Sequence, residues 1–469
     1  MDKATLNKKF DMEKLLLSFF IIAVVGFATF VIALIACACV SQSSLHTITG
    51  TTPFSDFAET LAYATVPNPY TGDYGVRSIY PPLSIYIFYP FTWFCSGALH
   101  QYTSGTITLA QLSSNAGLLA AFFMYYLINM AIIMFVVAKM SKLKGKNLFY
   151  LLSIVFCFGP LLFCFIRANN TLTVLTLTLL FFWLNNCEKR WQRELSYLCL
   201  AGAATMKIYP IFMIFYLIWK EHRLEKLWSV LKTIGYALVL IFLPFVIVEG
   251  HFANCAVLIK NVTGFSGGGA TQWGSNTSLE TVIYYMTTVL SPKLSILHKI
   301  LSPLLRYGLL GLAIILPAIS FKSKKYEQFV ILAIDTYLLW PGVSNGYCMS
   351  LMIIPLVLII MNFNSYKLWE KFYYAILFGI MLCPIFYMYS FFLPCAIANI
   401  AVVVKAIVDI IRDDCKIFKE MREEKAGKTQ EIKEEKVETE STIAEGEETD
   451  VAVEEIAEKG ATQSGQETV

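Results

Sequence analysis

The chain has 469 residues, of which 57% are hydrophobic and 15% are charged, whereas soluble domains carry about 25% charged residues. This composition excludes a soluble globular protein. It predicts an all-α, polytopic transmembrane helix bundle, because apolar runs of about 20 residues, the length that crosses a bilayer, recur along residues 15–404. The formal net charge of +3 averages basic loops with an acidic tail, so it gives no reason to expect a nucleic-acid partner.

The N-terminal segment, residues 1–14, is basic and polar and is expected to lie in the cytoplasm. The apolar run that follows, 15–40, is too long for a signal-peptide core, so it is interpreted as a retained first span. Lysine and arginine clusters in the later short loops are also expected to be cytoplasmic. This rule predicts about twelve spans with both termini inside, at approximately 15–40, 113–138, 147–166, 171–187, 194–206, 208–219, 229–249, 300–320, 328–343, 347–364, 372–391 and 393–411.

Two stretches do not behave as ordinary spans. Counting the apolar stretch 82–99 as a crossing would place the basic loop 139–146 outside, so we expect an interfacial helix at the outer face instead. The stretch 195–219 is too long for one span and too short for two, and it is interrupted at Lys207-Ile-Tyr-Pro210. Broken helices at membrane depth are tolerated where they line a cavity, so Lys207 is expected to face one.

Two long loops, about 41–112 and 250–299, lie on the predicted outer face, and the inner loops are short. Long loops in a compact domain are usually functional or disordered, and these contain aromatic residues, proline and glycine. We therefore expect the function to reside on the outer side of a membrane domain that extends over 15–411. The remaining segment, 412–469, is acidic and contains few large apolar residues, which predicts a disordered cytoplasmic tail.

Carboxylates are scarce in the predicted membrane domain, and those on the outer face are Asp56, Glu59, Asp73, Glu249 and Glu280. Asp56 follows the first span and precedes an amphipathic stretch at 57–64. A carboxylate near the membrane surface beside aromatic residues is placed as a general base for a lipid-linked substrate. The alternative is that Ser55 or Asp56 caps the helix that begins there.

Cations near the same level are candidates for binding a phosphate. Lys207, at the broken helix, would act as a point charge, whereas Arg77 and Arg167 offer planar pairs of donors. The alternative for Lys207 is a lysine that extends to the interface from a helix end. Asp335 is an acid within an apolar span, and either a functional role or a structural hydrogen bond to a neighbouring helix would explain it.

The five histidines show no spacing typical of metal ligands, so no metal site and no cofactor are expected. The 12 cysteines include no C-x-x-C pair, and they are interpreted as small apolar packing residues.

Several short motifs occur in an order that resembles the GT-C superfamily of membrane glycosyltransferases, and within it glycosyltransferase family 87, the polyprenyl-phosphate-mannose-dependent mannosyltransferases. Together they extend over most of residues 50–350. The motifs are Ser55-Asp56-Phe57, Tyr80-Pro81-Pro82-Leu83, Asn169-Asn170, the stretch AATMKIYP at 203–210, and Asn276-Thr277-Ser278-Leu279.

The resemblance implies a polyprenyl-phosphate sugar donor, a glycan or glycolipid acceptor at the extracytoplasmic face, and inversion at the anomeric carbon without a metal. It assigns Asp56 as the base, with Lys207, and also Arg77, neutralising the leaving phosphate. Tyr80, Asn169, Asn170 and Asn276 would contact substrates. The expected location is a bacterial plasma membrane.

One stretch departs from the family pattern. Where the family commonly has a late motif that ends in histidine, this chain has Trp340-Pro-Gly-Val-Ser-Asn-Gly-Tyr347-Cys. Tyr347 would donate one hydrogen bond in place of the histidine. Two other functions remain as alternatives: a transporter or flippase of a lipid-linked glycan, and a non-catalytic subunit of an envelope-assembly complex. A transporter would be expected to have a polar midplane site between inverted halves, whereas the candidate residues here lie towards one face.

Overall fold

The computed structural model describes residues 11–40, 52–73, 77–220, 223–267, 276–289, 293, 295–320, 326–383 and 392–425. Two units are distinguished, Met1–Ile410 and Ile411–Val469. Most of the predicted cytoplasmic N-terminus and most of the predicted acidic tail lie outside the described residues. The described part of the first unit is helical, with one isolated β-bridge, Asn276 to Asn345.

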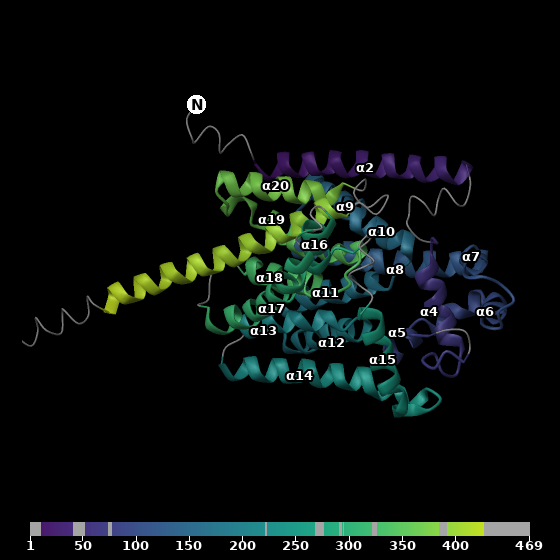
Figure 1. Ribbon diagram of the computed structural model, residues 1–469. Helices are drawn as coiled ribbons and strands as arrows, with labels where there is room; N and C mark the ends of the chain where they lie inside the picture. Colours follow the sequence, from purple (N-terminus) through teal and green to yellow (C-terminus); the bar gives the residue numbers. More distant parts are fainter. Residues whose placement is uncertain are drawn as a thin grey trace, which may run out of the picture. The chain divides into compact units, whose positions relative to one another are not determined.

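The first unit begins with α2 (Met12–Val40), and short helices of the first outer loop follow (Figure 1). They are α4 (Ser55–Thr65), α5 (Pro82–Tyr86), η1 (Tyr89–Phe94), α6 (Ser96–Thr103) and α7 (Leu109–Ser113). The next helices are α8 (Ala116–Ser141), α9 (Gly145–Phe156), α10 (Gly159–Arg167), α11 (Thr171–Asn185), α12 (Arg190–Met206), η2 (Tyr209–Met213), α13 (Ile214–Lys220) and α14 (Arg223–Phe242).

The second half of the unit starts with η3 (Leu243–Ile247), η4 (His251–Ala253) and α15 (Asn254–Gly267). It continues through α16 (Leu279–Tyr284), the π-helix η6 (Tyr285–Val289), α17 (Ser295–Ile319), α18 (Glu327–Leu339), η8 (Gly346–Met352), α19 (Ile353–Met361), η9 (Phe363–Ser365) and α20 (Leu368–Leu382). A further helix extends over Leu393–Lys425.

Five described helices are long and apolar enough to cross a membrane, and α9 with α10 forms a sixth candidate that is bent by 44°. These candidates support an all-α, multi-pass membrane protein. Three other predicted spans coincide with shorter apolar helices, Thr171–Asn185, Tyr209–Lys220 and Gly346–Met361. The number of about twelve spans therefore stays a prediction.

The break at Lys207 is confirmed. Helix α12 ends at Met206, Lys207 has extended backbone angles (φ −148°, ψ 128°), and η2 begins two residues later with Pro210 in its first turn. Proline has no N–H to donate and disfavours helical geometry in the residue before it. The sequence Lys-Ile-Tyr-Pro therefore separates α12 from α13 and leaves Lys207 between two helices.

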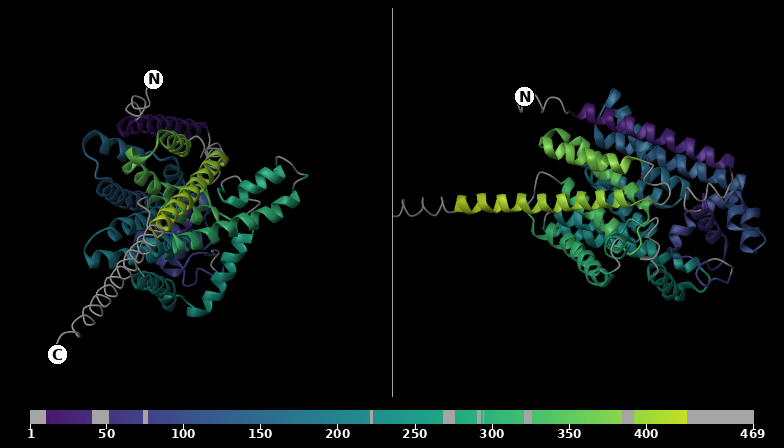
Figure 2. Two further views of the ribbon diagram at one scale, coloured as in Figure 1. Left: turned by 90° about the vertical axis from the view of Figure 1, so that its left-hand side faces the viewer. Right: turned by 45° about the horizontal axis from the view of Figure 1, so that its top comes forward.

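The predicted interfacial helix at 82–99 is divided into α5, η1 and the start of α6. Pro90 lies in the first turn of η1 and cannot continue the hydrogen-bond pattern of α5. Trp93 is 76% exposed and Tyr89 is 49% exposed, as expected for aromatic side chains that face lipid headgroups. These helices and α4 gather at one end of the longer helices in Figures 1 and 2.

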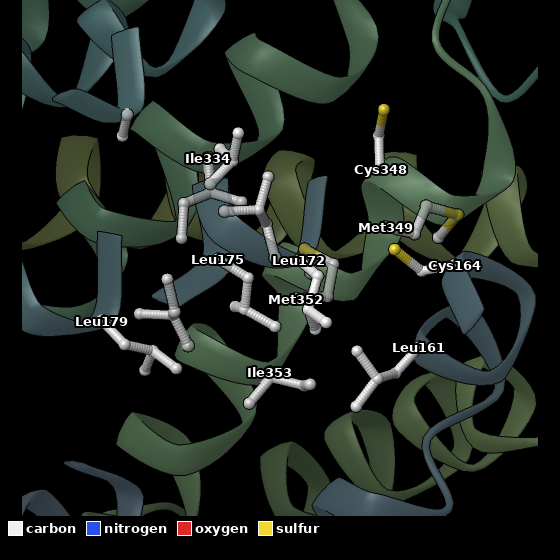
Figure 3. Close-up of a cluster of buried hydrophobic side chains, with 14 of the residues drawn as sticks. Leu161, Cys164, Leu172, Leu175, Leu179, Ile334, Cys348, Met349, Met352 and Ile353 are labelled. Carbon is white, nitrogen blue, oxygen red and sulfur yellow. The ribbon is translucent and has the colours of Figure 1, made fainter. Parts of the chain in front are cut away.

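The core beneath this end contains buried side chains from α10, α11, α18, η8 and α19 (Figure 3). Leu161 and Cys164 of α10, Leu172 of α11 and Met349 of η8 all belong to this buried cluster. Hydrogen bonds also join the helices, since Thr176 of α11 donates to the Asn129 side chain of α8 at 2.8 Å. The apolar packing and the polar bonds together fix the ends of α10, α11 and η8, which support the candidate site.

Candidate active site

The first outer loop returns to the membrane domain at Phe54, the residue before α4. Its backbone N–H donates to the Ile166 carbonyl at 2.8 Å, and its φ is +62°. Ala168, after α10, also has a positive φ of +51°. Non-glycine residues seldom adopt this conformation, and they persist in it where the surrounding contacts compensate for the strain. The start of α4 and the end of α10 are therefore held together by tertiary contacts.

Asp56 lies in the first turn of α4. Its carboxylate contacts Arg167, the last residue of α10, and Asn169, which follows α10. The Arg167 guanidinium donates twice, from Nη2 to Oδ1 at 2.6 Å and from Nε to Oδ2 at 3.2 Å. The Asn169 amide donates to Oδ2 at 2.6 Å. The helix cap proposed as the alternative is not formed, because Phe54 occupies the cap position and no side chain caps this helix. Asp56 is instead an oriented carboxylate in an ion pair.

Asn169 connects this ion pair to the start of α11. Its amide oxygen accepts from the Thr171 backbone N–H at 3.0 Å and from the Thr171 hydroxyl at 2.7 Å. These bonds set the orientation of the amide, so that its nitrogen faces Asp56. The neighbouring Asn170 is buried, and its amide has no hydrogen-bond partner among the described residues.

Glu59 lies one turn after Asp56 on the same face of α4. Burial raises the pKa of its carboxyl group, and the charge of Asp56 raises this pKa further, while Arg167 lowers it. Asp56 and Glu59 therefore differ in their surroundings. Asp56 is bound by a cation, whereas no ion pair to Glu59 is formed within the described part of the chain.

A cavity of about 460 Å³ opens beside the break at Lys207, within the range of small-molecule sites. The Lys207 ammonium nitrogen lies 4.6 Å from the centre of the Tyr347 ring and 4.0 Å from the Cys348 sulfur. Among the described residues, no carboxylate pairs with it. The remaining wall is largely apolar and aromatic, comprising Ile79, Tyr80, Pro81, Met206, Ile208, Tyr209, Ile211, Phe212, Val262, Tyr337, Trp340, Pro341, Val343, Ser344 and Asn345.

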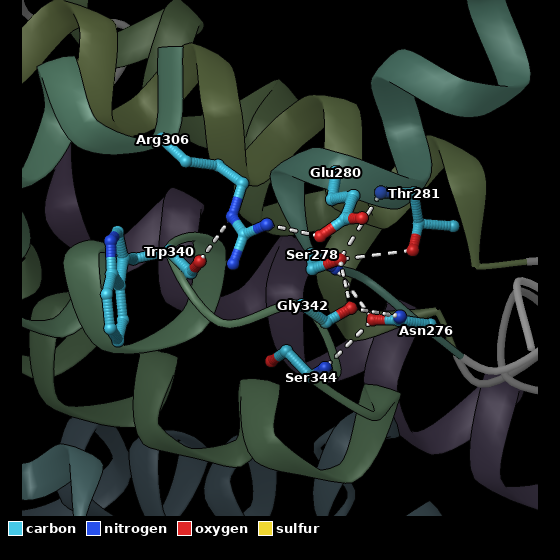
Figure 4. A network of polar contacts seen from close by, with 8 residues as sticks. All are labelled: Asn276, Ser278, Glu280, Thr281, Arg306, Trp340, Gly342 and Ser344. Atoms are coloured by element: carbon cyan, nitrogen blue, oxygen red, sulfur yellow. Dashed lines mark hydrogen bonds and ion pairs between the residues drawn. The ribbon is translucent and has the colours of Figure 1, made fainter. Parts of the chain in front are cut away.

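One wall of the cavity, residues 340–345, is clamped by the second outer loop (Figure 4). The Asn276 amide accepts from the Ser344 N–H at 2.8 Å and donates to the Gly342 carbonyl at 2.8 Å. Arg306 of α17 donates to the Trp340 carbonyl at 2.7 Å and forms an ion pair with Glu280 of α16. Asn276, predicted to contact substrate, thus has its amide directed to the backbone of the wall.

Another part of the cavity wall contains Tyr80, whose backbone is held by residues of the two outer loops. The Tyr70 hydroxyl donates to the Tyr80 carbonyl at 2.9 Å. The Asn261 amide donates to the carbonyls of Tyr70 and Ser78 at 3.1 and 3.0 Å. Tyr80 and Pro81, from the motif at 80–83, therefore lie at the cavity as parts of a braced loop.

The structure divides the predicted site residues into two groups and leaves some outside both. Asp56, Arg167 and Asn169 form the ion-pair group, and Lys207, Tyr80 and Tyr347 line the cavity. Tyr347 adjoins both groups, since it lies on η8, which packs against α10. Its hydroxyl accepts from the Asn345 amide at 2.9 Å. These six side chains are the candidate active site.

Two other predicted residues lie elsewhere. Arg77 is exposed and does not line the cavity. Asp335 is fully buried in α18, and its carboxylate lies beside the Asn399 side chain of the helix at Leu393–Lys425, as a structural contact with a neighbouring helix would require. Their roles stay predictions.

Sequence reasoning missed several residues of the cavity, including Tyr209, Tyr337 and Trp340. In an apolar helix an aromatic residue is usually a packing residue, so the sequence offered no reason to separate these three from the core. The pairing of Asp56 with Arg167 was also missed, because Arg167 was interpreted as a phosphate ligand. Among the described residues, no group of three or more histidine, cysteine or acidic side chains is arranged to hold a metal ion.

Comparison with known protein families gives one match, and it extends over both the Tyr80 loop and the Lys207 break. The model of glycosyltransferase family 87 matches residues 79–334. Comparison with curated proteins gives no match.

Proposed function

The chain belongs to glycosyltransferase family 87, whose model matches more than half of its residues, and we propose that it transfers mannose from a polyprenyl-phosphate carrier to a glycan or glycolipid. In this proposal the reaction takes place at the extracytoplasmic face of a bacterial plasma membrane and inverts the anomeric carbon. The partners are the membrane lipid, the lipid-linked donor and the acceptor. No cofactor or metal is invoked, because Lys207 supplies the positive charge.

The observation that carries this proposal is the position of Lys207 in a mainly apolar cavity. A lysine without a carboxylate partner is suited to an anionic ligand, which it binds as a point charge. The apolar wall, with Ile208, Ile211 and Phe212, suits the first isoprene units of a lipid. A polyprenyl phosphate combines both properties in one molecule.

The ion-pair group supplies the other half of the reaction. In the proposed step the acceptor hydroxyl gives its proton to the Asp56 carboxylate, and its oxygen forms a bond to the anomeric carbon. The bond between that carbon and the phosphate oxygen breaks, and the electron pair leaves with the phosphate. Negative charge grows on the phosphate during this step, so the Lys207 ammonium stabilises the transition state more than the ground state. A single displacement of this kind inverts the anomeric centre.

The proposal is tested by incubating the purified full chain with radiolabelled polyprenyl-phosphate sugars and a bacterial lipid extract. Mannose transfer to a lipid or glycan product is expected. Asp56→Asn should lower kcat by about 10²–10⁴-fold, the usual contribution of a general base. Asp73→Asn, which changes an exposed acid of the same outer loop, is the matched control and should retain wild-type turnover.

Lys207→Ala tests the other group. It should raise the donor KM and lower kcat, because the cation contacts the phosphate in both states. Lys146→Ala is the control, since Lys146 is exposed and pairs with Glu13 away from the cavity. Absence of a labelled product with every sugar tried would contradict the proposal and favour a transporter or an assembly subunit. Wild-type kinetics of Asp56→Asn would remove the assignment of Asp56 as the base.

A further inference from the structure

Two hydrogen-bond donors in the cavity wall have no partner within the described part of the chain. They are the hydroxyl group of Tyr337, near the end of α18, and the indole N–H of Trp340, just after it. Tyr337 is 2% exposed. Buried polar groups almost always form a hydrogen bond, because leaving one unpaired is unfavourable. Two such donors in one cavity therefore point to a ligand that accepts hydrogen bonds.

Both residues line the cavity, and their rings pack against η2, which begins two residues after Lys207. The Tyr337 ring is 5.8 Å from the ring of Tyr209, and the Trp340 ring is 5.5 Å from that of Phe212, both on η2. The Cys348 thiol lies close enough to the Tyr337 hydroxyl to interact with it, and the hydroxyl makes no hydrogen bond of normal distance and angle to a described residue. The same thiol is 4.0 Å from the Lys207 ammonium. The tyrosine hydroxyl and the lysine therefore meet at one part of the cavity.

The chemistry of the donors distinguishes between possible ligand groups. An indole N–H only donates, and a lysine ammonium only donates. A sugar hydroxyl would also need an acceptor for its own proton; the described cavity wall offers the side-chain oxygens of Ser344 and Asn345 for this but no carboxylate, the acceptor most favourable to a hydroxyl. A phosphate has several oxygens that only accept. The combination of one cation and two neutral donors matches a phosphate better than a sugar ring.

We propose that Tyr337 and Trp340 donate hydrogen bonds to the phosphate group that Lys207 binds, and so complete the site for the leaving polyprenyl phosphate. This inference rests on the proposed function for its ligand. The two residues act as catalytic residues in it, because they contact the leaving group. As the bond to the anomeric carbon breaks, charge accumulates on the phosphate, and preorganised donors in a water-poor cavity stabilise that charge without reorganising.

The backbone of this wall is already held in place in the absence of a ligand. Arg306 donates to the Trp340 carbonyl, and Asn276 contacts Gly342 and Ser344 (Figure 4). Preorganisation of this kind is what a charge-stabilising site requires, because donors that must first move into position contribute less.

The test compares binding of polyprenyl phosphate with binding of polyprenol of the same chain length. The purified full chain in detergent is used, and affinity is measured by the ligand-induced rise in thermal stability and by calorimetry. Tyr337→Phe and Trp340→Phe should each raise the Kd for polyprenyl phosphate about tenfold and leave the Kd for polyprenol unchanged. Tyr236→Phe and Trp228→Phe, which alter exposed residues of α14, are the matched controls and should bind both lipids as the wild type does.

The stability of the ligand-free protein gives a second measurement. Tyr337→Phe removes only a hydroxyl group that has no partner, so the ligand-free Tm should stay the same or rise. A fall in that Tm would mean that the hydroxyl serves an internal contact, and it would overturn the inference, as would unchanged phosphate binding in both variants. Binding does not require turnover. Suppose that the two variants lose affinity for polyprenyl phosphate only, while the wild-type protein transfers no sugar. The proposed phosphate site would then stand, and only the proposed glycosyl transfer would be rejected.

Discussion

Replacing Arg167 by lysine distinguishes two possible roles of this residue: orienting the Asp56 carboxylate and binding the donor phosphate. Lysine keeps the positive charge beside Asp56 but removes the planar pair of donors. In the structure the guanidinium makes two contacts with the Asp56 carboxylate, at 2.6 and 3.2 Å. A lysine would retain one of them. We therefore expect Asp56 to stay near its present position with a less restricted orientation.

The size of the effect follows from the lost contact. A hydrogen bond to a charged group contributes about 1.5–3 kcal/mol, and the side chains of Arg167 and Asp56 are 25% and 14% exposed, so solvent reduces this contribution. A loss of about 1.5–2 kcal/mol corresponds to a decrease in kcat of about ten- to thirtyfold. The donor KM should stay unchanged, because Arg167 does not line the cavity.

The assay measures initial rates against donor concentration at saturating acceptor for the wild type, Arg167→Lys and Arg167→Ala. The alanine variant should lose more kcat than the lysine variant. Arg77→Lys is the matched control and should behave as the wild type, since Arg77 is exposed and outside the cavity wall. A raised donor KM with an unchanged kcat in Arg167→Lys would refute this reasoning and would return Arg167 to the role of a phosphate ligand.

Three further predictions concern the clamp, the second acid and the tail. Asn276→Ala should lower the free energy of unfolding by about 2–6 kcal/mol, since the buried N–H groups of Ser278 and Ser344 lose their acceptor at about 1–3 kcal/mol each, and an unchanged Tm in detergent would contradict this. As the pH rises above 4.5, the wild type should lose stability relative to Glu59→Gln, because the raised pKa keeps a proton on the Glu59 carboxyl of the folded state that the unfolded state has released. A Tm difference between the two proteins that changes with pH in the opposite direction would count against this. Deletion of 426–469 should leave kcat and both KM values unchanged, because these residues lie outside the matched region 79–334, and a tenfold loss would give the tail a role in catalysis.

Local chemistry made part of the site predictable from the sequence. Pro210 removes a backbone donor and restricts Tyr209, so the sequence alone predicts the break beside Lys207. The membrane class followed from the apolar runs. The number of spans did not, because α11, α13 and η8 with α19 are apolar but shorter than a bilayer crossing requires. Periodicity cannot tell such a helix from a buried one.

Contacts between distant segments were the part that the sequence could not supply. Arg167 and Asn169 lie more than 100 positions after Asp56, and no local pattern links them. Asn276 was expected at the substrate from the family resemblance of its motif, whereas its amide holds the backbone of the cavity wall. A polar motif in an outer loop can bind a ligand or stabilise the fold, and its sequence is the same in both cases. The hydrogen-bond partners of its atoms show which of the two roles it has.

The two residues of the ion pair, Asp56 and Arg167, lie far apart in the sequence, and this has a consequence for biosynthesis. Asp56 and Arg167 are 111 positions apart, and translation adds about 5–20 residues per second. The carboxylate is therefore made about 6–20 seconds before its guanidinium partner. Lys207 in turn precedes Cys348 by 141 positions. The contacts of both charged groups therefore form only after the later helices have been made, so the candidate active site is completed late in synthesis.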